Sequence, residues 1–190
     1  MKTLLSLAIA MFLVLGAYAQ DDQPLSKKEL KKLQKEQKKA EQEAALAEAA
    51  LITEFMVTHQ RFVLEADYLS DKSGSRVSVQ STINFLLLDS LSGTVQFGSA
   101  FQAGYNGVGG ATIDGQISNY KYSRTGKKQD SFSVNYVFQS PLGHYDITLM
   151  VNANGNADAS IRGSWGGNLS YHGRLVPLGN SRIYKGSPSY

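Results

Sequence analysis

The segment SFSVNYVFQSPLGHYDITLMV, residues 131–151, sets the fold class, because its apolar residues recur at every second position. The first half places these apolar residues on one face: Phe132, Val134, Tyr136 and Phe138. The second half repeats the pattern with Tyr145, Ile147, Leu149 and Val151. A period of two sends alternate side chains to opposite faces of a β-strand. The intervening Ser-Pro-Leu-Gly is a short turn signal, so the segment predicts two half-buried antiparallel strands.

Alternation of the same kind extends on both sides of this segment. We predict strands at about residues 61–69, 77–88, 93–100, 110–123, 130–139, 143–152, 156–163 and 167–176. Short breakers separate them, and Asn154-Gly155 is the strongest hairpin signal. Because a parallel crossover needs a dozen residues or more, such short links require antiparallel pairing.

The sequence therefore predicts a mainly β domain over residues 61–178, followed by a C-terminal tail over residues 179–190. The domain is an antiparallel up-and-down sheet of about eight strands. The alternation fits a barrel and a sandwich equally well.

A charged segment, residues 20–60, precedes the sheet and predicts one long α-helix. Ser26 and Glu29 have the spacing of a capping box, in which each side chain bonds the backbone amide of the other residue. No Gly or Pro interrupts residues 27–54. The end of the helix carries an apolar stripe that we expect to pack on the sheet: Leu51, Ile52, Phe55 and Met56. The basic first half is then a solvated helix, a partner helix or a contact for an anionic surface.

The first residues have the pattern of a secretory leader. Lys2 precedes a largely apolar run over residues 4–15, and Ala17 and Ala19 supply the small residues that a signal peptidase requires. This run spans only about 18 Å as a helix, whereas the hydrocarbon core of a bilayer is about 30 Å thick. We therefore expect a signal peptide at residues 1–19, no transmembrane helix after its removal, and export to the periplasm or outer envelope.

The composition excludes several classes of site. The chain has 190 residues and no cysteine, which rules out disulfides, thiolate metal ligands and cysteine nucleophiles. Its formal net charge of +3 is too small to indicate a nucleic-acid partner. Hydrophobic residues make up 42% and charged residues 18%, which is typical of a folded chain. We predict no cofactor, no metal site and no nucleic-acid partner.

Several of the predicted strands resemble those of one exported protein family. The similar segments are residues 62–67, 110–117, 145–156, 173–178 and 181–186. Over about residues 55–186 the chain resembles Bacteroidota proteins grouped as domain of unknown function 4251. This family has no established activity, so the resemblance implies an exported location and supplies no catalytic residue. It also implies that Asp89-Ser90-Leu91 is a candidate O-glycosylation site, with the sugar on Ser90.

Candidate site residues fall into an apolar and a polar set. The apolar strand face would line a ligand cavity, and Trp165, flanked by glycines, would stack on a ligand or cap the end of a barrel. The predicted cavity residues are Phe132, Tyr136, Ile147, Leu149 and Trp165. The polar strand faces supply His144, Asp146 and His172, which suit acid–base chemistry, although ordinary polar decoration explains them as well. The sequence shows no set of nucleophile, base and orienting residue.

These observations favour a non-enzymatic exported β domain that binds an envelope protein or a small apolar ligand. The alternative is a structural envelope-associated protein that acts through its charged helix, and a hydrolase-type enzyme comes third. An integral outer-membrane barrel has the same alternation, with its apolar residues facing lipid. The long charged helix and the polar tail argue against that interpretation.

Overall fold

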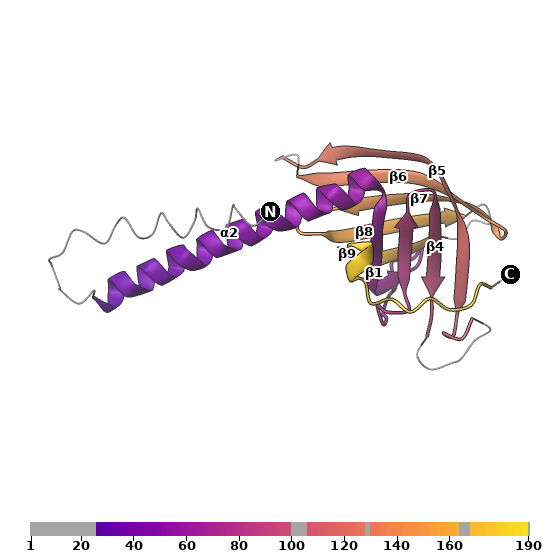
Figure 1. The fold of residues 1–190 in the computed structure, drawn as a ribbon. Coiled ribbons are helices and arrows are strands. Elements are labelled where there is room, and N and C mark those ends of the chain that lie inside the picture. The colour runs from indigo at the N-terminus through magenta and orange to yellow at the C-terminus, as the bar shows by residue number, and fades with distance from the viewer. Residues whose placement is uncertain (1–25, 100–105, 128–129, 164–167, 190) are drawn as a thin grey trace. The chain divides into compact units, whose positions relative to one another are not determined.

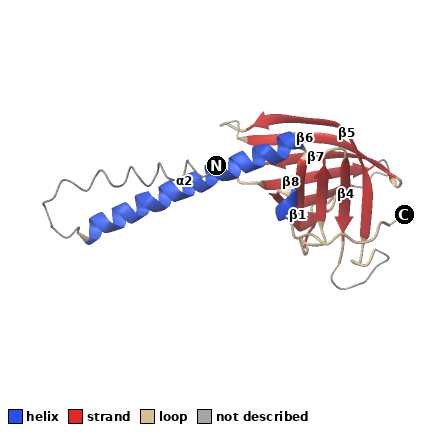
Figure 2. Ribbon diagram, in the orientation of Figure 1, coloured by secondary structure: helices blue, strands red, loops and turns tan. Residues whose placement is uncertain are grey.

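The computed structural model describes residues 26–99, 106–127, 130–163 and 168–189. In these residues one long helix precedes nine strands and a short 3₁₀ helix (Figure 1, Figure 2). The long helix is α2, Lys27–His59. The strands are β1 (Arg61–Ser70), β2 (Arg76–Ser78), β3 (Phe85–Asp89), β4 (Ser92–Phe97), β5 (Ala111–Thr125), β6 (Ser131–Ser140), β7 (Gly143–Val151), β8 (Asn156–Gly163) and β9 (Asn168–Val176). The 3₁₀ helix η1, Leu178–Asn180, follows β9.

Eight of the described strands close into an antiparallel barrel. Their hydrogen-bonded order is β1-β3-β4-β5-β6-β7-β8-β9, and β9 pairs with β1 to complete the ring. Strand β2 is an additional strand that pairs with residues 68–70 at the end of β1. The structure confirms the prediction of a mainly β chain with one N-terminal helix and an antiparallel up-and-down sheet. It also shows that this sheet is a barrel and not a sandwich.

One predicted strand is wrong in its extent. The sequence predicts a single strand over residues 77–88, whereas the chain forms β2 and β3 with a turn between them. The buried side chain of Asn84 holds this turn, because its Nδ2 donates to the carbonyl oxygens of Gln80 and Gly98. Its Oδ1 accepts from the backbone amide of Gly98. Local alternation does not reveal such a break, since Gly98 lies 14 residues further along the chain.

A β-bulge in β1 changes which of its side chains face outward. The register between β1 and β9 shifts between Ala66 and Tyr68. Ala66 packs in the core before the bulge, and Leu69 packs against the core after it. Tyr68 and Ser70 therefore lie on the outer face, where Tyr68 is opposite His172 of β9.

The barrel interior is a packed apolar core, and polar residues face outward. Strand β7 shows the pattern most clearly, because its buried residues are Tyr145, Ile147, Leu149 and Val151. The alternating residues of the same strand are exposed, namely His144, Asp146, Thr148 and Met150.

The last two turns of α2 close one end of the barrel. Met56 and Val57 are buried and belong to the core cluster. The hydroxyl of Tyr120 donates to the carbonyl of Val57 at 2.8 Å. Thr53 Oγ1 donates to the carbonyl of Ala153, in the turn between β7 and β8, at 3.4 Å. The docking face of the helix is therefore formed by Thr53, Met56 and Val57.

The predicted apolar stripe on the helix is only partly buried. Met56 packs in the core, whereas Leu51, Ile52 and Phe55 are exposed. The three docking residues at positions 53, 56 and 57 have the i, i+3, i+4 spacing of a single helix face, and the predicted stripe straddles two faces. The partner-helix interpretation stays a prediction.

The start of α2 is capped as the sequence predicts. The backbone amide of Ser26 donates to Glu29 Oε2 at 2.9 Å, and the amide of Glu29 donates to Ser26 Oγ at 3.4 Å. Within the described ranges, no helix has the length and apolar character needed to cross a bilayer.

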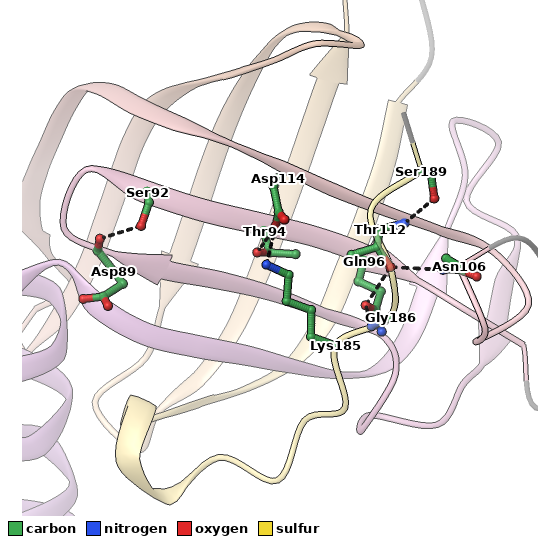
Figure 3. Close-up of polar contacts among 10 residues, drawn as sticks. All are labelled: Asp89, Ser92, Thr94, Gln96, Asn106, Thr112, Asp114, Lys185, Gly186 and Ser189. Atoms are coloured by element: carbon green, nitrogen blue, oxygen red, sulfur yellow. Dashed lines mark hydrogen bonds and ion pairs between the residues drawn. The ribbon is translucent and has the colours of Figure 1, made fainter.

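The C-terminal segment, residues 181–189, covers the outer wall of β4 and β5 (Figure 3). Gln96 Nε2 donates to the carbonyl of Tyr184, and Gln96 Oε1 accepts from the amide of Gly186, each at 2.9 Å. Lys185 Nζ lies 2.7 Å from Asp114 Oδ1. This part of the outer wall is therefore occupied by the chain itself, whereas β8, β9 and β1 keep exposed polar side chains such as Asp158.

Candidate functional site

An apolar cavity of about 240 Å³ lies at one end of the barrel. Its described lining residues are Val95, Phe97, Ile113, Phe138, Tyr145, Ile161, Gly163, Asn168 and Leu169. Phe138 and Tyr145 flank the turn between β6 and β7, and their ring centroids are 5.9 Å apart. Helix α2 contacts the β7–β8 turn instead. The cavity and the last turns of α2 therefore lie at opposite ends of the barrel.

The size and chemistry of this cavity suit a small apolar molecule. An apolar protein cavity of about 150 Å³ stays dry and binds benzene. Most lining side chains here are aliphatic or aromatic, and the polar side-chain groups among the described lining residues are the Asn168 amide and the Tyr145 hydroxyl. A cavity of this larger volume with the same kind of wall has room for a compact hydrocarbon or aromatic group.

The predicted cavity residues lie elsewhere in the barrel. Phe132, Ile147, Leu149 and Tyr136 are buried in the packed core, and none of them lines the cavity. Trp165 lies outside the described residues. Gly163 and Asn168, which flank its segment in the chain, do line the cavity. The alternation that selects Tyr136 and Ile147 continues to Phe138 and Tyr145, and these two residues do line the cavity.

The structure separates the predicted polar set of His144, Asp146 and His172. His172 lies opposite Asp158 in the strand register, and Asp158 lies opposite Met150 of β7. His144 is six residues before Met150, which places it roughly 20 Å away along the strand direction. Asp146 is displaced from His172 in the same direction, so these three side chains do not form one site.

His172 contacts two other polar side chains on the outer wall. Its Nε2 lies 2.8 Å from Ser70 Oγ, and its Nδ1 lies 2.6 Å from Asp158 Oδ1. The side chain of His172 is 20% exposed and that of Asp158 is 64% exposed, whereas Ser70 is 8% exposed. An ionised carboxylate only accepts hydrogen bonds, so Nδ1 carries a proton, and in the neutral ring Nε2 then has the lone pair that can accept from the serine hydroxyl.

Sequence reasoning missed this arrangement of serine, histidine and carboxylate, which we call the Ser70 site. Its residues come from β1, β9 and β8, and the first and last strands of the barrel meet only when it closes. The bulge in β1 then places Ser70 on the outer face with His172. The local sequence signal was limited to the polar faces of β8 and β9, which carry Asp158 and His172.

Two further predicted features have a definite place in the structure. Ser90 is exposed in the turn between β3 and β4, where its backbone φ is 58° and its amide donates to the carbonyl of Gln60. Its glycosylation stays a prediction. Within the described part of the chain, no group of three or more His, Asp or Glu side chains is arranged to hold a metal ion.

The chain is similar to one family and to a solved structure of that family. The sequence profile described as "Domain of unknown function (DUF4251)" matches residues 38–175. The crystal structure of a DUF4251 family protein from Bacteroides eggerthii DSM 20697 is 31% identical, with a TM-score of 0.59. The similarity covers 72% of this chain and 93% of that chain. No curated protein matches the chain. These findings confirm the resemblance inferred from the strands: the chain belongs to the DUF4251 family.

Proposed function

We propose that this protein is an exported β-barrel that binds a small apolar molecule in its terminal cavity. The observation that carries the proposal is the cavity of about 240 Å³ with largely aliphatic and aromatic walls. Elsewhere in the described part of the barrel the buried apolar side chains form one core cluster, and the last turns of α2 pack at the opposite end. A ligand in this cavity would lie among the ends of the strands.

The energetics of apolar burial support this use of the cavity. A dry apolar void leaves its lining atoms without contacts on one side, and a fitting apolar guest restores those contacts. Removing the surface of the guest from water contributes roughly 25 cal/mol per Å². The walls carry few polar groups, so selection among ligands would depend on shape more than on hydrogen bonding.

The proposed location depends on the leader pattern over residues 1–19 and on the family resemblance. A chain without cysteine is compatible with an oxidising compartment, because it has no thiol to mispair. The barrel core would then hold the fold without covalent cross-links.

Naphthalene is a suitable probe, because it is compact and has no hydrogen-bonding group. We expect it to raise the Tm of the purified protein and to shift the ¹H–¹⁵N signals of cavity residues such as Ile113 and Leu169. Val95→Phe should fill part of the cavity and weaken naphthalene binding at least tenfold, or about 1.4 kcal/mol. Val77→Phe, at an exposed position of β2, is the matched control and should bind like the native protein.

The proposal fails if naphthalene leaves the Tm and the cavity signals unchanged. It also fails if Val95→Phe and Val77→Phe bind naphthalene equally. If Val95→Phe does not fold, the native protein alone still tests the proposal, because the residues whose signals shift show whether naphthalene binds in the cavity.

A further inference from the structure

We propose that the Ser70 site is a second functional site, in which an activated Ser70 hydroxyl accepts the acyl group of small aryl esters. The site lies on the outer wall of the barrel, where β1, β9 and β8 are adjacent. It shares no residue with the lining of the apolar cavity. The two proposals therefore stand or fall separately.

The hydrogen-bond chain has the roles that nucleophilic catalysis requires. Ser70 Oγ lies 2.8 Å from His172 Nε2, which is within reach for proton transfer. Asp158 Oδ1, 2.6 Å from Nδ1, fixes the ring orientation and the tautomer. Such a set is recognised by geometry and roles and not by the order of its residues in the sequence. Ser70 and His172 are candidate catalytic residues, and Asp158 is a positioning residue.

Solvent exposure increases along the hydrogen-bond chain from Ser70 through His172 to Asp158. Ser70 is 8% exposed and the His172 side chain is 20% exposed, whereas the Asp158 side chain is 64% exposed. Partial exclusion of water strengthens the interaction between hydroxyl and imidazole. The carboxylate remains solvated, so its charge carries little desolvation cost.

Residues beside Ser70 define the class of substrate. Arg76 of β2 lies opposite Ser70 in the strand register, and side chains directly opposite on one face are about 5 Å apart at Cβ. Its guanidinium favours the oxyanion that develops on an attacked carbonyl. Tyr68 is exposed and lies opposite His172, so its ring offers an apolar surface beside the base. An ester of a small acyl group with an aromatic alcohol fits both features.

The reaction balances with water as the only co-reactant. Ser70 Oγ forms a bond to the ester carbonyl carbon while its proton moves to His172 Nε2. The tetrahedral oxyanion then collapses, the bond to the aryl oxygen breaks, and the leaving aryl oxide takes the proton from Nε2. Water attacks the acyl-serine by the same route, which releases the carboxylic acid and restores the hydroxyl.

A fluorophosphonate probe tests the nucleophile on the purified protein. Ser70 Oγ would bond to phosphorus, fluoride would leave, and the hydroxyl proton would pass to His172. We expect peptide mass mapping to place the label on Ser70. Ser70→Ala and His172→Gln should each lower the labelling rate by about 10²-fold or more. Ser170→Ala is the matched control, because Ser170 lies opposite Ser70 in the β1–β9 register. This variant removes a neighbouring serine hydroxyl but keeps Ser70, His172 and Asp158, so it should label like the native protein.

Hydrolysis of 4-nitrophenyl acetate tests the positioning residue. Asp158→Asn should lower kcat at least tenfold with little change in KM, because the amide removes the acceptor that fixes the ring tautomer. Asp158→Glu keeps a carboxylate and should recover part of kcat. Asp146→Asn, at an exposed position of β7, is the control and should keep the native kcat.

An unlabelled Ser70 in the native protein overturns the proposal, and so does equal labelling of the native and His172→Gln proteins. Identical kcat values for Asp158→Asn and the native protein remove the role given to Asp158. Circular dichroism shows which variants are folded. Mapping on the native protein still decides the case if Ser70→Ala does not fold.

Discussion

Gly173 occupies the seam where the first and last strands of the barrel meet. It lies opposite Ala66 in the β1–β9 register. A Cβ atom at Gly173 would overlap the carbonyl oxygen of Glu65 and the Cα atom of Ala66. Both are backbone atoms, so relief would require one strand to move away from the other.

Gly173→Ala should therefore destabilise the barrel by about 1–3 kcal/mol, the usual cost of forcing atoms into a packed position. Gly179→Ala is the control, because a Cβ atom there has no neighbour within 4 Å. Urea unfolding followed by circular dichroism measures both changes. Equal midpoints for the two variants would show that the seam tolerates the extra methyl group.

His172 shows how much of the candidate site the sequence could predict. Alternation correctly places it on the polar face of its strand. Its partner Ser70 is 102 residues away in the chain and reaches the same face only through the bulge in β1. Neither barrel closure nor a one-residue shift of register leaves a local mark on the sequence. Asp158 was missed for a simpler reason, since many strand residues in this chain are exposed and polar.

At the scale of elements, the hairpins were the most predictable part of the fold. The predicted strands at 130–139, 143–152 and 156–163 differ from β6, β7 and β8 by at most one residue at each end. Their apolar faces are buried and their links are short, so local pattern and tertiary structure agree. The break between β2 and β3 depends on Asn84, whose partners a periodic pattern does not identify.

The end of α2 makes the clearest energetic prediction at this scale. Met56 is 2% exposed in the core cluster, whereas Leu51 is 69% exposed on the same helix. Met56→Ala should lower the free energy of unfolding by about 2–5 kcal/mol, because it removes buried methylene groups and leaves a cavity. Leu51→Ala should change it by no more than about 0.5 kcal/mol. Thermal and urea unfolding measure the two variants, and a comparable loss in both would mean that the sequence-predicted stripe, including Leu51, also stabilises the barrel.

At the scale of the whole molecule, closure of the barrel was not predictable from alternation. A sandwich would show the same strands, turns and apolar faces. The deciding contact is the pairing of β1 with β9, which spans residues 63–70 and 170–176. The C-terminal segment gave little signal either, because three of its contacts with Gln96 and Thr112 use backbone groups that any sequence possesses, namely the carbonyl of Tyr184 and the amides of Gly186 and Ser189.

Closure also buries tyrosine hydroxyls. The stability of the whole barrel should therefore vary with pH in the alkaline range. Burial raises the pKa of the Tyr136 and Tyr171 phenols above their ordinary range, and desolvation does the same for Tyr120. The unfolded chain then releases phenolic protons at a lower pH than the folded chain. Stability should be fully present below about pH 10, the ordinary phenol value, and should fall as the pH rises above it.

The expected slope is about 1.4 kcal/mol per pH unit for each buried tyrosine that stays protonated in the folded state. Tyr136→Phe and Tyr171→Phe should each reduce the slope by that amount. The Tyr171 variant also loses the hydrogen bond from its hydroxyl to the carbonyl of Gln96. This second effect lowers stability by the same amount at every pH and adds nothing to the change in slope. Tyr184→Phe, at an exposed position, is the control for removing a phenol. Urea unfolding between pH 8 and about pH 12 measures these slopes. If Tyr136→Phe and Tyr171→Phe both keep the slope of the native protein, the barrel opens to solvent before its tyrosines ionise.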